Sequence, residues 1–577
     1  MKVKLSEGRQ FIANVWFLTK SYWQSEARKK AFLLLSTIII LTFAYVYILV
    51  LLNKWNNAFY TALQNYETAT IFNELLHFSW LAALYIIVAV YSFFLQQMLA
   101  LNWRKWLTQK YLDEWLSKKT YYRLQMFGSY TDNPDQRISE DVKLFVEMTL
   151  QFTVGILKAF CTLVSFVVIL WQLSGPLVFN VFTKNIVIPG YLVWIALIYA
   201  IIGTTLTHKI GKKLIGLNFV QQKYEANFRF SMMRLRENAE SVAFYDGEKH
   251  ENSVFKKRFS LLLDNFWQII LKQKQLVWLN SGYSQIAIIF PFVVSMPRYL
   301  SKQISLGGLM QIATAFGRVQ DSLSYFLDMY SSLAQWKSTV DRLVGFGLHM
   351  NNVDINAQSE LIIKRDLAAN KLFVEKVVID LPNGSVLLQD LNFELPLGRN
   401  LLIKGKSGSG KSSLLRTLAG IWPYASGVMV LPPASDMMFV PQKPYLPLGT
   451  LKETLLYPSK LNKSDEEIKA LLEMCSIGYL ANQMKIEADW SHILSVGEQQ
   501  RLAFVRILIY EPKWLFLDEA TSALDEETEE KMYALLAQRL LETTIVSIGH
   551  RSTLAKFHID EIFINREAGT AILHRNF

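Results

Sequence analysis

The sequence predicts two domains of different kinds, a membrane domain of α-helices followed by an α/β domain. Of its 577 residues, 51% are hydrophobic and the mean hydropathy is +0.19, which is more apolar than is usual for a water-soluble chain of this length. The long apolar runs lie in the first half, and from about residue 370 short strand-like stretches alternate with helical patterns. We therefore expect a membrane domain at 1–340, a polar, unpatterned linker at 341–370 and an α/β domain at 371–577.

The membrane domain is expected to contain six transmembrane helices. Residues 31–52 form an uncharged apolar run, and a helix needs about 20 residues to cross a bilayer. The last two candidates are less apolar, because they contain Pro291, Arg318, Asp321 and Asp328. The six predicted spans are residues 31–52, 78–100, 152–173, 188–207, 279–297 and 305–330.

Charges in the connecting segments predict the orientation of these spans. Lysine and arginine gather before the first span and after the second and fourth, whereas the connections after the first and third hold one lysine each, Lys54 and Lys184. Because basic loops stay in the cytosol, both termini and the α/β domain are expected there. The same bias accounts for the net charge of +11, so no nucleic-acid partner is expected.

A phosphate-binding loop is predicted near the start of the α/β domain. "GKSGSGKSS" follows a strand-like stretch and precedes a helix-like one, the order that the pattern G-x-x-x-x-G-K-[ST] requires. Lys411 would neutralise the β- and γ-phosphate oxygens, and the hydroxyl of Ser412 would bind Mg²⁺. The residues expected to bind nucleotide here are Gly405, Ser407, Gly408, Ser409, Gly410, Lys411, Ser412 and Ser413.

Polar residues at the ends of later strands are expected to complete a hydrolytic site. In "KWLFLDE", an apolar strand ends in Asp518, a ligand for Mg²⁺, and Glu519, a general base for the attacking water. Gln442 and His550 also follow strand-like runs, where each could reach the water, the metal or the γ-phosphate. Taken singly, Gln442 or His550 would be an ordinary loop residue, and the acid pair a solvated turn.

A second anion-binding segment is predicted at "LSVGEQQR", residues 494–501. The hydroxyl of Ser495, the N–H groups of Val496 and Gly497 and the start of a helix all favour an anion. Since a phosphate loop already stands earlier in the chain, the segment by itself leaves open whose phosphate it binds.

The order of these motifs resembles that of an ATP-binding cassette, and the six predicted spans before them resemble the membrane part of a half-transporter. "NPDQRISEDV" in the first half and "DWSHILSVGEQQRLAFVRIL" in the second are similar to peroxisomal acyl-CoA transporters and to bacterial SbmA/BacA-like proteins with a fused ATPase. The resemblance implies an exporter-type membrane fold joined to a P-loop ATPase that binds ATP and Mg²⁺, in a bacterial inner membrane.

The resemblance also implies whose phosphate the second segment binds. Such cassettes stack head to tail, so Ser495, Gly497 and Glu498 of one copy contact the γ-phosphate held by the other, and Asp525 of "SALD" joins the nucleotide-site residues. One cassette and six spans imply a homodimer with two composite sites. A heterodimer with a related half is the alternative.

Three residues depart from the usual cassette pattern. Val496 replaces the first glycine of the signature, Glu498 stands where many cassettes have glutamine, and Leu381 occupies the place of an aromatic ring that stacks on adenine. Selectivity for adenine is therefore open.

Two further segments bear on transport. Residues 237–251, "ENAESVAFYDGEKHE", are similar to the segment that meets the ATPase in the family, the alternative being a solvated cytosolic turn. The sixth span carries a polar stripe that we expect to line the substrate path, because charges facing lipid cost several kcal/mol; the alternative is an Arg318–Asp321 pair that locks helix packing. The stripe is Gln311, Thr314, Arg318, Asp321, Tyr325 and Asp328.

The expected function is ATP-driven transport of a bulky amphipathic substrate across the lipid bilayer. The resemblance implies an acyl compound, a peptide or a cobalamin-like compound, and it fixes neither the substrate nor the direction. An ATP-gated channel or a regulatory receptor of the same architecture is the alternative. A soluble ATPase acting on nucleic acid is disfavoured by the apolar spans.

Overall fold

The computed structural model describes residues 2–126, 133–181, 184–356, 361–366, 370–458, 461, 463–565 and 570–575. The chain divides into two compact units. The first comprises Met1–Asp113 and Asp132–Gly347, and the second comprises Glu114–Thr131 and Leu348–Phe577. Glu114–Thr131 thus come from the first half of the sequence but belong to the second unit. There the hydroxyl of Tyr424 donates to the carbonyl of Met126 at 3.1 Å.

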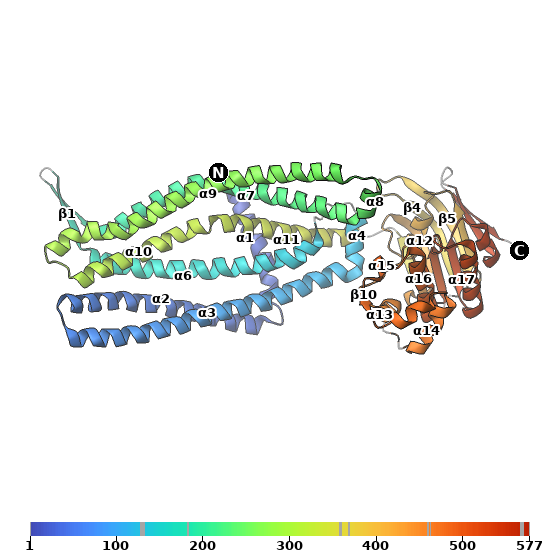
Figure 1. Ribbon diagram of the computed structural model, residues 1–577, viewed down its shortest axis with the longest axis horizontal. Coiled ribbons are helices and arrows are strands. Elements are labelled where there is room, and N and C mark those ends of the chain that lie inside the picture. The colour runs from blue at the N-terminus through green and yellow to red at the C-terminus, as the bar shows by residue number, and fades with distance from the viewer. Residues whose placement is uncertain are drawn as a thin grey trace. The chain divides into compact units, whose positions relative to one another are not determined.

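The first unit is built of long helices (Figure 1). One of them, α10 (Leu306–Asp328), contacts α2, α6, α7 and α9, and its residues Ile312, Ala315, Phe316 and Val319 are buried in the shared core. The helices and strands from the start of the chain to the second unit are α1 (Lys2–Trp23), α2 (Arg28–Gln64), α3 (Thr68–Leu116), η1 (Ser117–Lys119), α4 (Thr120–Met126), α5 (Pro134–Gln136), η2 (Arg137–Asp141), α6 (Val142–Ser174), the antiparallel pair β1 (Pro176–Val181) and β2 (Lys184–Pro189), α7 (Tyr191–Glu237), α8 (Ala239–Phe244), α9 (Glu248–Leu300), α10 and α11 (Tyr330–Asn356).

Five helical stretches are long and apolar enough to cross a membrane, judged over the described residues. They are Arg28–Gln64, Thr68–Met126, Pro134–Ser174, Tyr191–Glu237 and Glu248–Leu300. The first five predicted spans fall on these stretches, except that the fourth begins at residue 188, in β2. The sixth, residues 305–330, falls on α10, which is not among the five. The count of six spans therefore stays a prediction.

The N-terminal part of the polar stripe on α10 is a packing seam. The side-chain amide of Asn57 donates to Gln311 Oε1 at 2.8 Å, and that of Asn56 donates to Thr314 Oγ1 at 3.3 Å. Both asparagines belong to α2, and Gln311 is only 6% exposed. Hydrogen bonds between two spans hold polar groups that lipid could not satisfy, so these two residues serve helix packing.

The middle of the stripe differs. Arg318 and Asp321 attract each other electrostatically, but over the described residues they form no ion pair within 4.0 Å. The locked pair that was the alternative to a substrate path is thus not formed as a direct contact. The side chain of Asp328 lies outside the described residues.

The expected lack of pattern in residues 341–370 is wrong over much of that segment. α11 continues to Asn356, and its residues Val340, Leu343, Phe346 and Met350 are buried at intervals of three or four. Polar residues separate these apolar residues in the sequence and obscure the pattern. On the helix the apolar residues form one buried face, which stabilises the helical conformation. The same segment then supplies β3 (Leu361–Arg365), which pairs in parallel with β7 (Ala425–Leu431).

The second unit contains two larger sheets and the short antiparallel pair of β9 and β10, with helices packed around its strands (Figure 1). A six-stranded sheet has the order β14-β13-β6-β12-β11-β8, parallel except for β14, and a four-stranded sheet has the order β3-β7-β4-β5. The strands and helices not yet given are β4 (Lys371–Asp380), β5 (Val386–Pro396), β6 (Leu401–Gly405), α12 (Lys411–Leu418), η3 (Ala434–Asp436), β8 (Met437–Val440), β9 (Gly449–Thr450), α13 (Leu451–Leu456), α14 (Asp465–Met474), η4 (Gly478–Gln483), β10 (Glu487–Ala488), α15 (Trp490–Ile493), α16 (Val496–Tyr510), β11 (Trp514–Asp518), α17 (Glu526–Arg539), β12 (Thr544–Ile548), η5 (Ser552–Phe557), β13 (Asp560–Asn565) and β14 (Thr570–Arg575).

Strand β11 is buried on both faces of the six-stranded sheet. Leu515 and Leu517 pack into a core with α16 and α17, whereas Trp514 and Phe516 pack into a core with α12 and the four-stranded sheet. Successive side chains of a strand point to opposite faces, so an unbroken apolar run is what a central parallel strand needs. The α/β domain predicted from such runs is confirmed.

The parallel strands of this sheet end at one level. In the register of the sheet, Asp518 of β11 pairs with Ile548 of β12, which pairs with Ile403 of β6. On the other side of β11, Leu517 pairs with Val440 of β8. The chain therefore leaves four neighbouring strands at the same edge, where ligands bind in open α/β sheets.

A buried charge network holds the first unit together. Asp141 is 2% exposed, and it accepts from Arg137 at 2.6 Å and from Arg342 at 2.6 Å and 2.8 Å. Arg137 and Asp141 lie in η2, whereas Arg342 lies in α11, so the carboxylate joins segments about two hundred residues apart.

We expect Asp141→Asn to destabilise the protein by about 3 kcal/mol, because it leaves two arginines without their buried counter-charge. Thermal unfolding of the full chain in nanodiscs measures the change. Glu140→Gln is the matched control, since Glu140 is exposed next to it. Equal unfolding temperatures for the two variants would contradict this role.

Candidate functional site

The loop between β6 and α12 has a backbone that only glycine fits at two positions. Gly405 has φ 155°, and a Cβ there would lie 2.7 Å from the carbonyl oxygen of Ile564. Gly410 has φ 104°, and a Cβ there would lie 2.9 Å from Leu387. The tight loop leads directly into the N-terminus of α12 at Lys411, where free N–H groups favour phosphate.

Side chains of the same loop turn toward its interior. Lys411 is buried, and its Nζ donates to the carbonyls of Gly405 at 2.9 Å and Lys406 at 3.1 Å. Burial lowers the pKa of Lys411, and the charges of Glu519 and Asp518 oppose that shift. Ser409, in the same loop, is 1% exposed, and over the described residues its hydroxyl has no hydrogen-bond partner. The loop thus offers a cation and an unused hydroxyl.

The predicted acid pair lies beside this loop. The hydroxyl of Ser412 donates to Asp518 Oδ1 at 3.0 Å. Burial raises the pKa of Asp518, and the neighbouring charge of Glu519 raises it further. A hydroxyl and a carboxylate in contact are oxygen ligands of the kind that Mg²⁺ prefers together with phosphate oxygens.

Glu519 is the point where three strand ends meet. It has φ 47°, and its N–H donates to the carbonyl of Ile548 at 3.2 Å. The side-chain amide of Gln442 donates to Glu519 Oε2 at 3.1 Å, and His550 Nε2 lies 3.6 Å from Glu519 Oε1. The structure therefore brings together Gln442, Asp518, Glu519 and His550 next to the phosphate loop, as the sequence predicted.

The signature segment is built as a helix N-terminus. Ser495 is the N-cap of α16: its N–H and hydroxyl donate to Glu498 Oε2 at 2.8 Å and 2.7 Å, and the N–H of Glu498 donates to Ser495 Oγ at 3.3 Å. The hydroxyl of Tyr479 donates to the other oxygen of Glu498. The hydrogen bonds from the hydroxyls of Tyr479 and Ser495 lower the pKa of Glu498. Over the described residues, no side-chain hydrogen bond links Ser495 or Glu498 to the phosphate loop.

Val496 and Gly497 of the signature segment leave the start of α16 open to another molecule, and Asp525 lies at the start of α17. Val496, which replaces a glycine, is 50% exposed, so its side chain points away from the core. At Gly497 a Cβ would lie 3.2 Å from the carbonyl of Ala523, which explains the need for a small residue there. Asp525 caps α17 and accepts from the N–H of Thr528 at 2.7 Å.

Two residues of α16 were missed by the sequence analysis. Gln500 is 1% exposed; its amide donates to the carbonyl of Gln442 at 3.0 Å and to Ser522 Oγ at 3.2 Å, and its Oε1 accepts from the N–H of Ala523 at 3.0 Å. It ties the signature helix to the Gln442 loop and to the segment after Glu519. The signal in the sequence is a polar residue facing the core just before the apolar run of α16.

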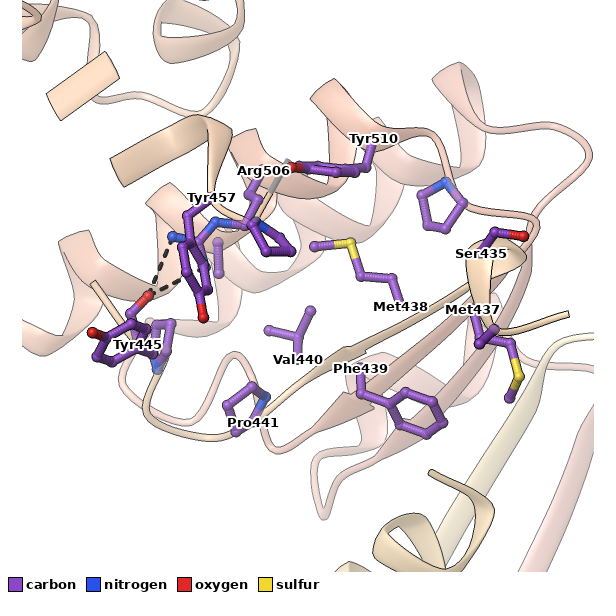
Figure 2. Close-up of a pocket in the computed structure, with 15 residues that line it drawn as sticks. Ser435, Met437, Met438, Phe439, Val440, Pro441, Tyr445, Tyr457, Arg506 and Tyr510 are labelled. Carbon is purple, nitrogen blue, oxygen red and sulfur yellow. Dashed lines mark hydrogen bonds between the residues drawn. The ribbon is translucent and has the colours of Figure 1, made fainter. Parts of the chain in front are cut away.

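Arg506 is the second missed residue. It lines a cavity of about 450 Å³, whose lining residues are drawn in Figure 2. Its guanidinium donates to the carbonyl of Tyr445 at 3.2 Å and to that of Thr454 at 2.7 Å. Tyr457 and Tyr510 line the same cavity. Arg506 thus fixes the chain that follows Gln442 against the signature helix.

Comparison with known proteins gives matches over both units. Residues 18–300 match the family described as ABC transporter transmembrane region 2, and residues 388–522 match the ABC transporter family. An uncharacterized ABC transporter ATP-binding protein of Haemophilus influenzae is 36% identical over 98% of this chain and 94% of its own length. The inner membrane ABC transporter ATP-binding protein YddA of Escherichia coli is 33% identical over 94% of this chain and 96% of its own.

More distant matches extend the group. The human lysosomal cobalamin transporter ABCD4 is 30% identical over 80% of this chain and 79% of its own. A bacterial Atm1-family ABC exporter with ATP bound has the same fold, with a TM-score of 0.70, 18% identity and 96% coverage of both chains. The chain belongs to the ABC transporters, as a half-transporter in which a membrane-spanning helical region precedes one ATP-binding cassette that couples ATP hydrolysis to transport.

Proposed function

We propose that two copies of this chain form a transporter that moves a bulky amphipathic substrate across the bacterial inner membrane. The observation that carries the proposal is that, over the described residues, no side-chain hydrogen bond joins Ser495 to the phosphate loop of the same chain. The phosphate loop has Glu519, Gln442 and His550 beside it. Over the described residues, the side chain of Ser495 in the same chain forms hydrogen bonds with Glu498 of its own helix and with no other residue. A second copy stacked head to tail would bring its signature to these phosphates.

Within each site the roles follow from the contacts. Lys411 and the N–H groups of α12 would hold the phosphates, and Glu519 would take the proton of the attacking water. Gln442 and His550, one on each carboxylate oxygen, would fix the orientation of that base. Mg²⁺, held by Ser412, Asp518 and Gln442, would supply charge neutralisation on the phosphates.

Location and substrate rest on the relatives. The Escherichia coli relative is described as an inner membrane protein, which supports the same location here. The human relative is described as a cobalamin transporter, which supports a bulky substrate. The basic connections of the first unit support cytosolic termini and a cytosolic cassette.

We expect Glu519→Gln to bind ATP and to hydrolyse it at least about a hundredfold more slowly, because the water loses its base while the phosphate loop is intact. Lys411→Ala should weaken binding itself. Glu527→Gln, exposed on α17, is the matched control. Rates and binding are measured on the purified chain in lipid. Wild-type turnover by Glu519→Gln would overturn the assigned role of the base.

The same variant separates a pump from a channel. In proteoliposomes, a pump accumulates a fluorescent fatty-acyl probe only while ATP is hydrolysed, so Glu519→Gln should abolish accumulation. An ATP-dependent conductance that persists in Glu519→Gln would instead show that the architecture serves as a channel.

We also propose that residues 237–251 relay the state of the ATPase to the membrane helices. α8 lies in this segment, and Phe244 and Tyr245 at its end are 79% and 84% exposed. Two adjacent aromatic side chains that are exposed together form an apolar patch, and such a patch marks a contact surface more than a single exposed ring does.

Replacing Phe244 and Tyr245 together by alanine should leave basal hydrolysis intact and reduce substrate-stimulated hydrolysis by about fivefold or more, because coupling free energies are of this size. Tyr66→Ala is the control, since Tyr66 is 88% exposed in the turn between α2 and α3. Unchanged stimulation in the double variant would show that the segment is a solvated turn.

A further inference from the structure

Two cations inside predicted spans of the first unit have no hydrogen-bond acceptor and no ion-pair partner among the described residues. Lys158 is on α6 and Arg318 is on α10. Over the described residues, neither side chain donates a hydrogen bond, and neither forms an ion pair within 4.0 Å. A lysine or arginine side chain that faces lipid within a span is strongly unfavourable, so both should face water or protein.

Two tyrosines from two further helices meet these cations. The ammonium of Lys158 lies 3.8 Å from the ring centroid of Tyr45 on α2, and the hydroxyl of Tyr45 lies 2.8 Å from that of Tyr85 on α3. Arg318 is within electrostatic range of both Lys158 and Tyr85. The cluster of Lys158, Arg318, Tyr45 and Tyr85 thus joins four helices, and all four residues fall in predicted spans.

The charge of this cluster is not balanced by the described residues. Arg318 repels Lys158, and Asp321 is the carboxylate that attracts Arg318. One of the two hydroxyl hydrogens of Tyr45 and Tyr85 forms the hydrogen bond between them, and the other has no acceptor among the described residues. Two cations, one spare hydroxyl donor and two aromatic rings offer charge and hydrogen bonds to an anion and an apolar wall to what is attached to it.

Arg298 is a cation of the same unit whose charge is neutralised by hydrogen-bond acceptors of the protein. Its guanidinium donates to the carbonyls of Leu173 at 2.9 Å and Ser174 at 2.5 Å, at the C-terminal end of α6. There the helix dipole and two acceptors neutralise the charge. Lys158 and Arg318 have no such acceptors in the described part of the chain, so a packing role leaves their charge unexplained.

We propose that Lys158, Arg318, Tyr45 and Tyr85 bind the anionic head group, a carboxylate or a phosphate, of the amphipathic substrate. The inference rests on the proposed transport function and gives its substrate a charge. Lys158 is exposed in the single chain, whereas Arg318, Tyr45 and Tyr85 are partly buried.

The test uses the full chain in phosphatidylcholine nanodiscs with three probes of equal chain length, dodecyl phosphate, uncharged dodecyl maltoside and cationic dodecyltrimethylammonium. Dodecyl phosphate alone should stimulate ATP hydrolysis. Lys158→Gln and Arg318→Gln should each raise the half-maximal concentration about tenfold, since charge-assisted hydrogen bonds are among the stronger contacts. Lys158→Arg keeps the positive charge and should retain the response. Lys54 is exposed toward the C-terminal end of α2, and Lys54→Gln should leave the response unchanged.

Binding of radiolabelled dodecyl phosphate is measured directly on the wild type, Lys158→Gln and Arg318→Gln. Wild-type binding that is lost in both glutamine variants, at unchanged basal hydrolysis, supports the site. Equal binding by wild type and variants, or equal stimulation by all three probes, overturns it. A basal rate that does not depend on Glu519 would instead contradict the proposed ATPase mechanism, so the two failures are distinguishable.

The same variants distinguish a soluble anion from a lipid head group. In discs that contain phosphatidylglycerol, occupation of the site by lipid would raise basal hydrolysis in the wild type but not in Lys158→Gln, and dodecyl phosphate would add nothing. That result supports an anion site whose ligand is the lipid. An unchanged response to dodecyl phosphate supports the soluble amphiphile as the ligand.

Discussion

The nucleotide site depends on one constraint, the register of the parallel strands β6, β12, β11 and β8. Ile403, Ile548 and Asp518 lie at one level across the sheet. The loops that follow these strands must therefore begin side by side. Strands this apolar can sit only in the middle of a covered sheet, so the hydrophobic pattern of the cassette also decides where its polar groups emerge.

The contacts around Glu519 follow from that edge. Gln442 reaches one carboxylate oxygen and His550 lies near the other, so three strand ends fix the orientation of one group. Gln500 and Arg506 then connect the signature helix to the loop that carries Gln442. Hydrogen bonds run from Gln500 through Gln442 to Glu519, so a change at Gln500 can alter the orientation of that carboxylate. Gln500 is buried, so water cannot replace these partners.

Sequence reasoning placed the strand, loop and helix around Lys411 and the acid pair correctly, because glycine spacing and apolar runs are local signals. It missed Gln500 and Arg506, because their partners are chosen by packing between segments distant in the sequence. Gln500 contacts Gln442, 58 residues away, and Arg506 contacts Tyr445 and Thr454, 61 and 52 residues away. It also missed the apolar face of α11 and the β1–β2 hairpin. The polar stripe of α10 shows the same limit, since periodicity gives one helix face but does not tell that Gln311 meets an asparagine of α2.

The central claim is that the signature of one chain completes the nucleotide site of another, and cysteine cross-linking tests it most directly. Ser407 is exposed in the phosphate loop and Val496 is half exposed in the signature. Both are changed to cysteine in a Glu519→Gln chain whose Cys161 and Cys475 have been replaced. The account predicts that ATP produces a covalent dimer through Ser407→Cys of one chain and Val496→Cys of its partner. If ATP binds and both thiols react with maleimide, yet no inter-chain disulfide forms under mild oxidation, the shared site is contradicted.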